Sequence, residues 1–315
     1  MKCRVCRGPA VIDIRRHNAN FCAEHFLRLF KDQVVKAIAD FHMVEQGERV
    51  LVAVSGGKDS LALWDVLLDL GYDVDGLYVG LGIGAYSDAS GEHARAFASA
   101  RGLTLLEVDL PERFGYDIPT GAKAARRAPC SACGLSKRHL FDMTAIDGGY
   151  DVLVTGHNLD DEAAVLFGNT MHWKTDFLGR QLPVLAARDG FPRKAKPLVR
   201  LAERETAAYC VLRDIDYIVD ECPMAAGNRH LGYKEALNAV EATSPGTKHD
   251  FYFGFLARAS ERFRDEVVAE QDALRPCDRC GAPTPTGVCA FCRLVERAAG
   301  AQSVELSVRA RQGKP

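Results

Sequence analysis

A short glycine turn between an apolar run and an amphipathic run constrains this chain more than any other feature. Residues 50–54, Val-Leu-Val-Ala-Val, have the composition of a buried strand, and Ser-Gly-Gly-Lys-Asp-Ser follows at 55–60. Glycine lets the backbone approach an anion closely, and the unpaired N–H groups that open the next helix point at that anion. The sequence therefore predicts a strand, a tight turn and a helix built around a pyrophosphate group.

The same turn excludes one common nucleotide-binding loop. A Walker A loop requires Gly-Lys followed by Ser or Thr, whereas here Asp59 follows Lys58. A Ras-like or kinase-like interpretation therefore fails. The turn resembles the PP-loop of ATP pyrophosphatases, a family that adenylates a substrate oxygen and releases pyrophosphate. ATP is the first ligand to expect.

Composition limits the class of protein. The chain has 315 residues, of which 47% are apolar and 26% charged, enough for one large core with small appendages. A net charge of −2 gives no global sign of nucleic-acid binding, so RNA contact has to rest on local basic runs. The chain shows no apolar run of the ~18 residues that a membrane span needs and no signal-peptide pattern. We therefore expect a cytoplasmic protein with no membrane partner.

Eleven cysteines without an export signal indicate metal ligation or redox chemistry rather than disulfides. Seven of these cysteines and one histidine occur in closely spaced pairs, which form two sets of four residues. Each set can fill a tetrahedral zinc site. We therefore expect two structural Zn²⁺ ions, one held by Cys3, Cys6, Cys22 and His25 and the other by Cys277, Cys280, Cys289 and Cys292.

A third group of cysteines is one ligand short of a closed site. Cys130 and Cys133 form a C-x2-C pair, and Cys222 stands alone before a proline. Spacing alone leaves three possibilities open: a redox-active dithiol, a zinc site with an unidentified fourth ligand, and an iron–sulfur cluster. Cys210 lies within an amphipathic helical pattern, where a cysteine is commonly buried, and we leave it out of the site.

Strand and helix patterns alternate through the middle of the chain, which predicts an α/β fold with a doubly wound parallel sheet. Because ligands collect at the carboxyl ends of such strands, Ser55, the glycine-rich loop 80–84 and residues 157–161 should surround one crevice. The expected strands cover 50–54, 74–79, 103–108 and 151–155, and helices are expected from Lys58 to Gly71, from 89 to 101 and, after a basic loop, from Cys130 through Leu140.

We expect three parts along the chain. Residues 1–30 would form an N-terminal zinc finger, residues 31–272 the PP-loop catalytic domain with the third cysteine group, and residues 273–315 a C-terminal zinc finger and tail. The boundaries follow the two sets of zinc ligands.

The order of these motifs resembles that of the TtuA/Ncs6 family of tRNA 2-thiouridine synthetases. The resemblance covers nearly the whole chain and rests on 55–60, the Cys130 pair, Gly-His-Asn-Leu-Asp-Asp at 156–161, Cys222-Pro223 and both terminal lobes. The related TtcA group, which thiolates cytidine 32, lacks an N-terminal zinc lobe. The resemblance implies a HUP-like PP-loop fold and favours a [4Fe-4S] cluster on Cys130, Cys133 and Cys222.

The resemblance also implies a reaction. AMP is transferred to the C2 oxygen of a tRNA uridine, because oxygen is a poor leaving group until it is activated, and sulfur then attacks C2. The open iron of the cluster would present sulfide; direct persulfide chemistry on Cys130 or Cys222 is the alternative. ATP, with Mg²⁺ between its phosphates, would lie against Ala53, Ser55, Gly56, Gly57, Lys58, Asp59, Ser60, Val79, Gly156 and Asn158.

Three further side chains receive roles in that reaction. Lys137 and Asp161 are expected to activate or orient the uridine, and Asp59 to hold the metal through water or to brace the loop. The alternatives are a solvated helix lysine for Lys137 and, for Asp161, a first-turn acid favoured by the helix dipole.

The expected partners are tRNA, a ubiquitin-like carrier with a thiocarboxylated end that delivers sulfur, and a second copy of the chain in a homodimer. The expected target is uridine 54, with uridine 34, cytidine 32 or another PP-loop synthetase reaction as alternatives. A non-catalytic zinc-bearing RNA-binding protein is disfavoured by the intact turn. Basic runs that could contact tRNA phosphates lie at 15–16, 123–127, 137–138 and 193–200.

Overall fold

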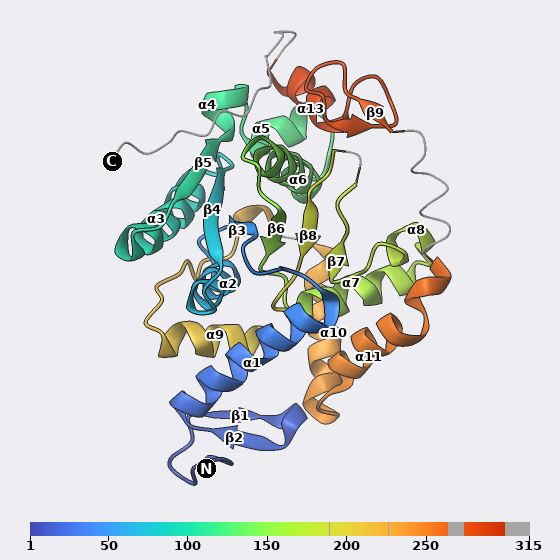
Figure 1. The fold of residues 1–315 in the computed structure, drawn as a ribbon. Coiled ribbons are helices and arrows are strands. Elements are labelled where there is room, and N and C mark those ends of the chain that lie inside the picture. Colours follow the sequence, from blue (N-terminus) through green and yellow to red (C-terminus); the bar gives the residue numbers. More distant parts are fainter. Residues whose placement is uncertain (189, 226, 264–273, 300–315) are drawn as a thin grey trace.

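The computed structural model describes residues 1–188, 190–225, 227–263 and 274–299 (Figure 1). The described residues contain a six-stranded sheet with the strand order β5-β4-β3-β6-β8-β7. Neighbouring strands are parallel except for β7, which is antiparallel to β8. The strands are β3 (Arg49–Val54), β4 (Asp73–Gly80), β5 (Leu105–Asp109), β6 (Val152–Thr155), β7 (Val184–Leu185) and β8 (Arg193–Ala195).

Strand β3 shows why the sheet is covered on both faces. Its successive side chains point to opposite faces, so Val50, Val52 and Val54 enter one core and Leu51 and Ala53 the other. The first core includes side chains of α1 (Ala23–Phe41), α2 (Lys58–Asp69), α3 (Gly84–Arg101) and α9 (Glu203–Leu212). The second includes side chains of α5 (Ile118–Ala124), α6 (Pro129–Asp147) and α13 (Ala290–Ala299). The predicted α/β fold, a mostly parallel sheet between helices, is confirmed.

The strand order places the ligand crevice. From β3 the chain proceeds to β4 and β5 on one side, and then returns to place β6 on the other side of β3. The carboxyl ends of β3 and β6 therefore flank a topological switch point, where open parallel sheets bind ligands. The helices that follow these strands, α2 and α7 (Leu159–Met171), begin at this edge.

Two local expectations were wrong. Helix α3 begins at Gly84 rather than near Ala89, so the glycine-rich loop is shorter than expected. The segment before α6 was expected to be a loop, but it contains α5 and the short helix α4 (Leu110–Phe114). Asp109 and Asp117 accept hydrogen bonds from the first turns of these two helices, each of which has a proline near its start. This pairing of an Asp cap with proline was the available sequence signal.

Small lobes lie at opposite ends of the view, one formed by the N-terminal residues and the other by the C-terminal residues up to 299 (Figure 1). The first contains β1 (Ile12–Ile14), η1 (Arg15–His17) and β2 (Ala19–Phe21), and the second β9 (Arg275–Pro276), β10 (Pro283–Thr284) and α13. The remaining elements are α8 (Thr175–Leu178), η2 (Pro223–Ala225), α10 (Arg229–Thr243), α11 (Thr247–Arg258) and η3 (Ser260–Phe263). Among the described helices, none has both the length and the apolar character needed to cross a bilayer.

Helix α1 joins the N-terminal lobe to the central sheet. It runs without a break through residue 30, where we expected a domain boundary. Its buried residues include Phe26, Phe30 and Val34, which lie on one face at helical spacing. The Phe30 ring stacks on Tyr209 of α9, with 4.0 Å between the ring centroids. The domain boundaries remain a prediction, and residues 264–273 and 300–315 lie outside the described residues.

The stack on Tyr209 predicts that α1 stabilises the catalytic domain. We expect Phe30→Ala to lower the free energy of unfolding by about 3–5 kcal/mol, because it leaves a cavity at a fully buried position. Val35 lies on the same helix and is 45% exposed, so Val35→Ala should change stability by less than about 0.5 kcal/mol. Urea unfolding followed by circular dichroism measures both variants, and equal losses of stability would contradict the packing of Phe30 against Tyr209.

Candidate functional site

A cleft of about 360 Å³ opens at the carboxyl ends of the sheet strands. Six residues of the expected ATP site line it: Ala53, Ser55, Asp59, Ser60, Val79 and Gly156. Lys137 of α6 and Asp161 of α7, the expected catalytic side chains, line the same cleft. The structure thus brings together residues that are spread over more than a hundred positions of the sequence, from Ala53 to Asp161.

The other four residues expected to bind ATP do not line this cleft. Gly56 has a φ of +73°, and a Cβ there would lie 2.1 Å from the carbonyl oxygen of Ser90, so only glycine fits. Gly57 and Lys58 begin α2 on the other side of the turn. Asn158 is buried and caps α7, where its side-chain oxygen accepts hydrogen bonds from the backbone N–H groups of Asp160 and Asp161.

Asp59 holds three helices together at the edge of the cleft. Its Oδ1 accepts a hydrogen bond from Asn158 Nδ2 at 3.1 Å and another from the hydroxyl of Thr206 on α9. Its Oδ2 accepts one from Lys58 Nζ at 3.1 Å. Burial raises the pKa of Asp59, an effect that the contacts with Lys58 and Thr206 only partly offset. Both carboxylate oxygens are therefore engaged in bracing the loop.

A chain of alternating charges continues from Lys58 to Asp161. Glu203 accepts hydrogen bonds from Lys58 Nζ at 2.8 Å and from Lys234 Nζ at 3.1 Å, and Lys234 also lies 2.6 Å from Asp161 Oδ1. Burial alone would lower the pKa of both lysines, but their carboxylate neighbours outweigh it and raise both values. Burial would likewise raise the pKa of Glu203, yet the two lysines lower it. Lys58, Lys234 and Glu203 are therefore held in their charged forms.

Asp161 has a structural role as well as its place in the cleft. Its Oδ2 accepts a hydrogen bond from the backbone N–H of Asn158 at 3.1 Å, which completes a capping box at the start of α7. The helix-capping alternative for Asp161 is therefore present in the structure. Because Lys234 contacts the other carboxylate oxygen, this side chain is fixed in position where it faces the cleft.

The third cysteine group lies beside the cleft. Cys130 and Cys133 occupy the first turns of α6, and Cys130 Sγ lies 3.4 Å from the carbonyl oxygen of Met224, two residues after Cys222 in the chain. Burial raises the pKa of Cys133, while Lys137, one turn further along α6, lowers it. Tyr86 lines the cleft, and burial together with the nearby Cys222 and Cys133 raises its pKa. Cys210 is buried in α9, as expected, and burial raises its pKa to about 12.

Sequence reasoning missed several residues of the site. Glu203, Thr206 and Lys234 come from helices that follow the recognised motifs, and nothing in their local sequence marks them. Leu81, from the expected loop 80–84, lines the cleft. The cleft is also lined by residues that were not expected there, and only their places near the ends of β4 and β6 or on α3 and α6 could have suggested them: Tyr78, Tyr86, Ser87, Ser90, Phe141 and Thr155. His157 lines the cleft as well, and its Nδ1 lies 2.7 Å from the Thr155 hydroxyl.

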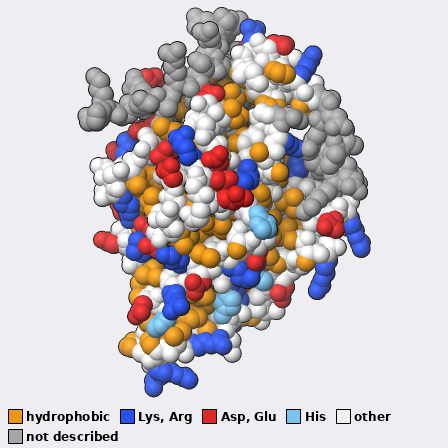
Figure 2. All heavy atoms as spheres, in the orientation of Figure 1, with side chains coloured by type: hydrophobic (Ala, Val, Ile, Leu, Met, Phe, Trp, Pro, Cys, Tyr) orange, Lys and Arg blue, Asp and Glu red, His pale blue; other side chains and the backbone are white. Residues whose placement is uncertain are grey.

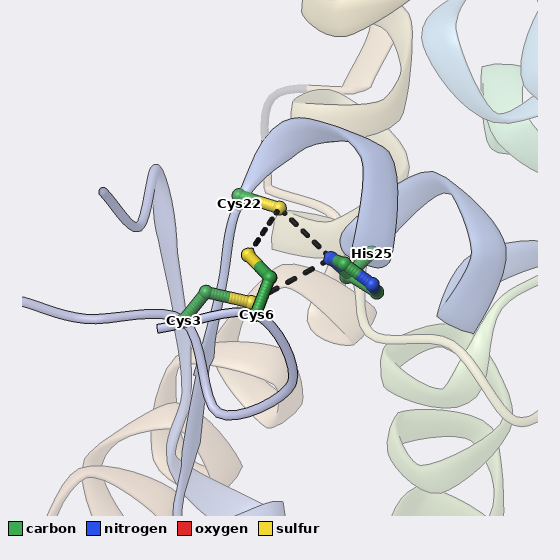
Figure 3. A group of neighbouring side chains, drawn as sticks. All are labelled: Cys3, Cys6, Cys22 and His25. Carbon is green, nitrogen blue, oxygen red and sulfur yellow. Dashed lines mark hydrogen bonds between the residues drawn. The ribbon is translucent and has the colours of Figure 1, made fainter. Parts of the chain in front are cut away.

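The two four-ligand sets each come together in space. In the N-terminal set, Cys6 Sγ lies 3.8 Å from Cys22 Sγ, and His25 Nδ1 lies 3.8 Å from Cys3 Sγ and 3.0 Å from Cys22 Sγ (Figure 3). In the C-terminal set, the pairs Cys277–Cys292 and Cys280–Cys289 lie 3.9 and 3.8 Å apart. Tetrahedral zinc with bonds of about 2.3 Å places two sulfurs about 3.8 Å apart. Both sets fit one metal ion each.

Cys130, Cys133 and Cys222 differ from these sets. Within the described residues they do not form a group of donor atoms as compact as the two terminal sets. A single metal ion requires donors that converge on one point, whereas an iron–sulfur cluster holds its thiolates further apart. The wider spacing and the set of three thiols therefore fit a cluster better than a single ion.

Several basic residues that we expected to contact tRNA have internal partners instead. The run at 193–200 forms four ion pairs with distant carboxylates: Arg193 with Glu48, Lys194 with Asp142, Lys196 with Glu162, and Arg200 with Asp40. Arg16 pairs with the buried Glu205. Figure 2 shows basic and acidic side chains interspersed on the face that it presents. These pairs stabilise the fold and leave little unpaired charge on this run for a phosphate.

Thr206 offers a direct test of the Asp59 network. Its side chain is fully buried, and its hydroxyl donates to Asp59. Thr206→Val keeps the shape but removes that donor, and we expect it to lower the free energy of unfolding by about 1–3 kcal/mol, because the half-buried carboxylate of Asp59 loses a partner. Thr206→Ser keeps the hydroxyl and should cost clearly less. Urea titrations compare the two, and equal losses would show that the hydrogen bond contributes nothing.

Comparison with known proteins agrees with this geometry. Residues 2–27 match the family described as "2-thiouridine synthetase TtuA, N-terminal LIM domain", and residues 26–228 match the PP-loop domain family. A relative from Thermus thermophilus, named tRNA-5-methyluridine(54) 2-sulfurtransferase, is 50% identical over 93% of this chain and 91% of its own. A relative of the same name from Pyrococcus horikoshii is 40% identical over 93% of each chain.

A solved structure shows the same fold. The U34-tRNA thiolase NcsA from Methanococcus maripaludis, described with its [4Fe-4S] cluster, superposes with a TM-score of 0.78 at 25% identity, covering 93% of this chain and 95% of its own. With 93% of this chain covered, the match extends well beyond the PP-loop turn. With its PP-loop, its N-terminal LIM domain and relatives of 40–50% identity over almost its full length, this chain belongs to the TtuA family of PP-loop proteins.

Proposed function

We propose that this protein is an ATP-dependent tRNA 2-sulfurtransferase that adenylates the C2 oxygen of uridine 54 and replaces it with sulfur. One observation carries the proposal: Lys137 lines the same cleft as Ser55, Asp59 and Ser60, and it lies one helical turn from Cys133. A single base in this cleft would face both the phosphate-binding turn and the cysteine group. The names of the two relatives at 50% and 40% identity favour uridine 54 over uridine 34, the target named for the more distant NcsA.

The first step places ATP in the turn. Backbone N–H groups at the start of α2 and the ammonium of Lys58 would hold the pyrophosphate end, and Ala53 and Val79 would hold the adenosine. The C2 oxygen of the uridine attacks the α-phosphorus, the bond to pyrophosphate breaks, and the N3 proton of the base leaves. Lys58 is charged, so it offsets the charge that develops on the leaving pyrophosphate.

Lys137 and Asp161 would act on the base. The Lys137 ammonium stabilises the negative charge that the attacking C2 oxygen carries as N3 loses its proton, and the Asp161 carboxylate orients the N3–H edge of the ring. Lys234 holds the Asp161 side chain in place through their ion pair. In the second step sulfur attacks C2, the C2–O bond breaks, and AMP departs with the oxygen while a proton returns to N3.

The donor sets fit the expected cofactors. Cys130, Cys133 and Cys222 would hold the [4Fe-4S] cluster, which, with only three protein ligands, leaves one iron open to an external sulfur ligand. Mg²⁺ would lie between the phosphates, and because both oxygens of Asp59 have protein partners, we assign Asp59 to bracing the loop. Two Zn²⁺ ions complete the proposal and rest on the two compact donor sets. The thiocarboxylated carrier protein and the homodimer rest on the family resemblance, and the cytoplasmic location rests on the sequence pattern.

The proposal is tested by an anaerobic reaction of cluster-reconstituted protein with ATP, Mg²⁺, sulfide and unmodified tRNA. Nucleoside mass spectrometry with positional mapping should find 2-thiouridine or 5-methyl-2-thiouridine at position 54. Thiolation at 34 or 32 instead would assign the alternative target. No thiolation by a protein with an intact cluster and bound tRNA would contradict the sulfurtransferase assignment.

Lys137 can be tested against a lysine outside the site. We expect Lys137→Met to lower the rate of tRNA thiolation at least about 100-fold, since one preorganised charge at the reacting oxygen contributes that much. Lys36 lies on α1 with an exposed side chain paired to Asp40, and Lys36→Met should keep the full rate. Single-turnover thiolation measures both variants. An unchanged rate in Lys137→Met would support the alternative of a solvated helix lysine.

The zinc assignment predicts metal content. Purified wild-type protein should contain two zinc ions per chain, and Cys6→Ser and Cys280→Ser should each retain one, because each removes a ligand from a different set. Cys210→Ser should retain both, since Cys210 lies outside the two sets. Elemental analysis by plasma mass spectrometry gives the counts. Loss of zinc from Cys210→Ser, or retention of both zinc ions by Cys6→Ser or Cys280→Ser, would contradict the assignment.

A further inference from the structure

Large apolar side chains are exposed together at the junction of α7 and α8. Trp173 is 73% exposed, Met171 62% and Phe177 58%. The other tryptophan of the chain, Trp64, is fully buried in the core. A soluble protein rarely leaves its largest side chain in water without a partner.

The backbone around Trp173 is held in place. The Trp173 N–H donates to the carbonyl of Thr170 at 3.1 Å, and the Lys174 N–H donates to that of Asn169 at 3.0 Å. Trp173 has a φ of +48°, in the left-handed region that bulky side chains rarely adopt. Such a conformation costs free energy and persists where the surroundings enforce it, often at functional sites. The indole is therefore presented to solvent from an ordered turn.

Aromatic and basic groups surround this turn. Lys174 Nζ lies 5.6 Å from the centroid of the Phe177 ring, and no ion pair of Lys174 occurs among the described residues. His172 Nε2 lies 2.9 Å from the Tyr233 hydroxyl, and the His230 ring lies 6.0 Å from that of Tyr233. We call His172, Trp173, Lys174, His230 and Tyr233 the Trp173 surface.

Helix α10 connects this surface to the cleft. Tyr233 contacts His172, and the next residue, Lys234, contacts Asp161. Asp161 lies in the first turn of α7 and His172 directly after its last residue, and the 13 residues of this helix span about 20 Å. That distance matches several stacked nucleotides, so one RNA loop could reach both the cleft and the Trp173 surface.

We propose that Trp173 stacks on an unpaired base of the substrate tRNA while Lys174 contacts a neighbouring phosphate. The inference rests on the proposed function and adds to it a contact outside the cleft. Single-stranded parts of RNA are recognised by stacking on aromatic side chains combined with basic groups. An interface with a second protein chain would be depleted in lysine at its centre. The exposed Trp173 with Lys174 beside it therefore favours RNA over a second copy of the chain.

The two tryptophans make the test direct. Trp64 is buried, so quenching of tryptophan fluorescence in the cluster-loaded protein on addition of unmodified tRNA should come from Trp173. Trp173→Phe should abolish that quenching. Trp173→Ala should weaken tRNA binding about tenfold, as expected for the loss of one stacked base. Trp173→Tyr, which keeps an aromatic face, and Val35→Ala, an exposed apolar residue on α1, should bind tRNA as the wild type does.

Three results would overturn the inference. One is unchanged tRNA affinity of Trp173→Ala in a preparation whose wild type thiolates tRNA, which would leave the proposed function intact. Another is equal weakening in Trp173→Ala and Trp173→Tyr. A third is a Trp173→Ala variant that no longer forms a dimer in sedimentation velocity but still binds tRNA as the wild type does. That result would make the surface a subunit interface. Failure of the wild type to bind tRNA would instead contradict the proposed function itself.

Discussion

The half-buried carboxylate of Asp59 is the interaction on which the site depends. It joins the start of α2 to α7 through Asn158 and to α9 through Thr206, and it also holds Lys58. A carboxylate at this depth is costly unless every lone pair has a partner, and here both oxygens are bonded. The turn at 55–60 is thus fixed before any ligand arrives. This preorganisation is what a phosphate-binding loop requires, because its N–H groups must already point at the anion.

Helix α6 connects the two halves of the proposed chemistry. Its first turns carry Cys130 and Cys133, and Lys137 follows at the spacing that keeps it on the same side of the helix. Lys137 and Tyr86 line the cleft, and Tyr86 lies near Cys133 and Cys222, so a base in the cleft would lie beside the cysteines. The C-terminal lobe packs on α6, where Phe291 stacks on His139 at 4.1 Å between ring centroids. The second zinc site would therefore support the helix that positions the cysteines.

The sequence predicted those parts of the site that lie directly after strands. Apolar runs of strand length and glycine at the turn have local physical causes, so Ser55, Asp59 and Gly156 could be placed at one crevice in advance. The zinc ligands were predicted for the same reason, since two ligands with two residues between them can bind the same ion. Glu203, Thr206 and Lys234 could not be predicted, because their roles arise only when α9 and α10 pack beside α2 and α7. The ion pairs of 193–200 have partners as distant as Asp40 and Glu48, so local sequence showed only a basic run.

The proposed reaction depends on activation of a uridine oxygen in this cleft by transfer of AMP to it. It is tested most directly with tRNA carrying ¹⁸O at C2 of the target uridine, in a single turnover with ATP, Mg²⁺ and sulfide. Activation by AMP transfer predicts that thiolation moves the label to the phosphate of AMP, with one pyrophosphate released for each uridine converted. Thiolated tRNA with the label in water, or with ADP as the nucleotide product, would contradict it.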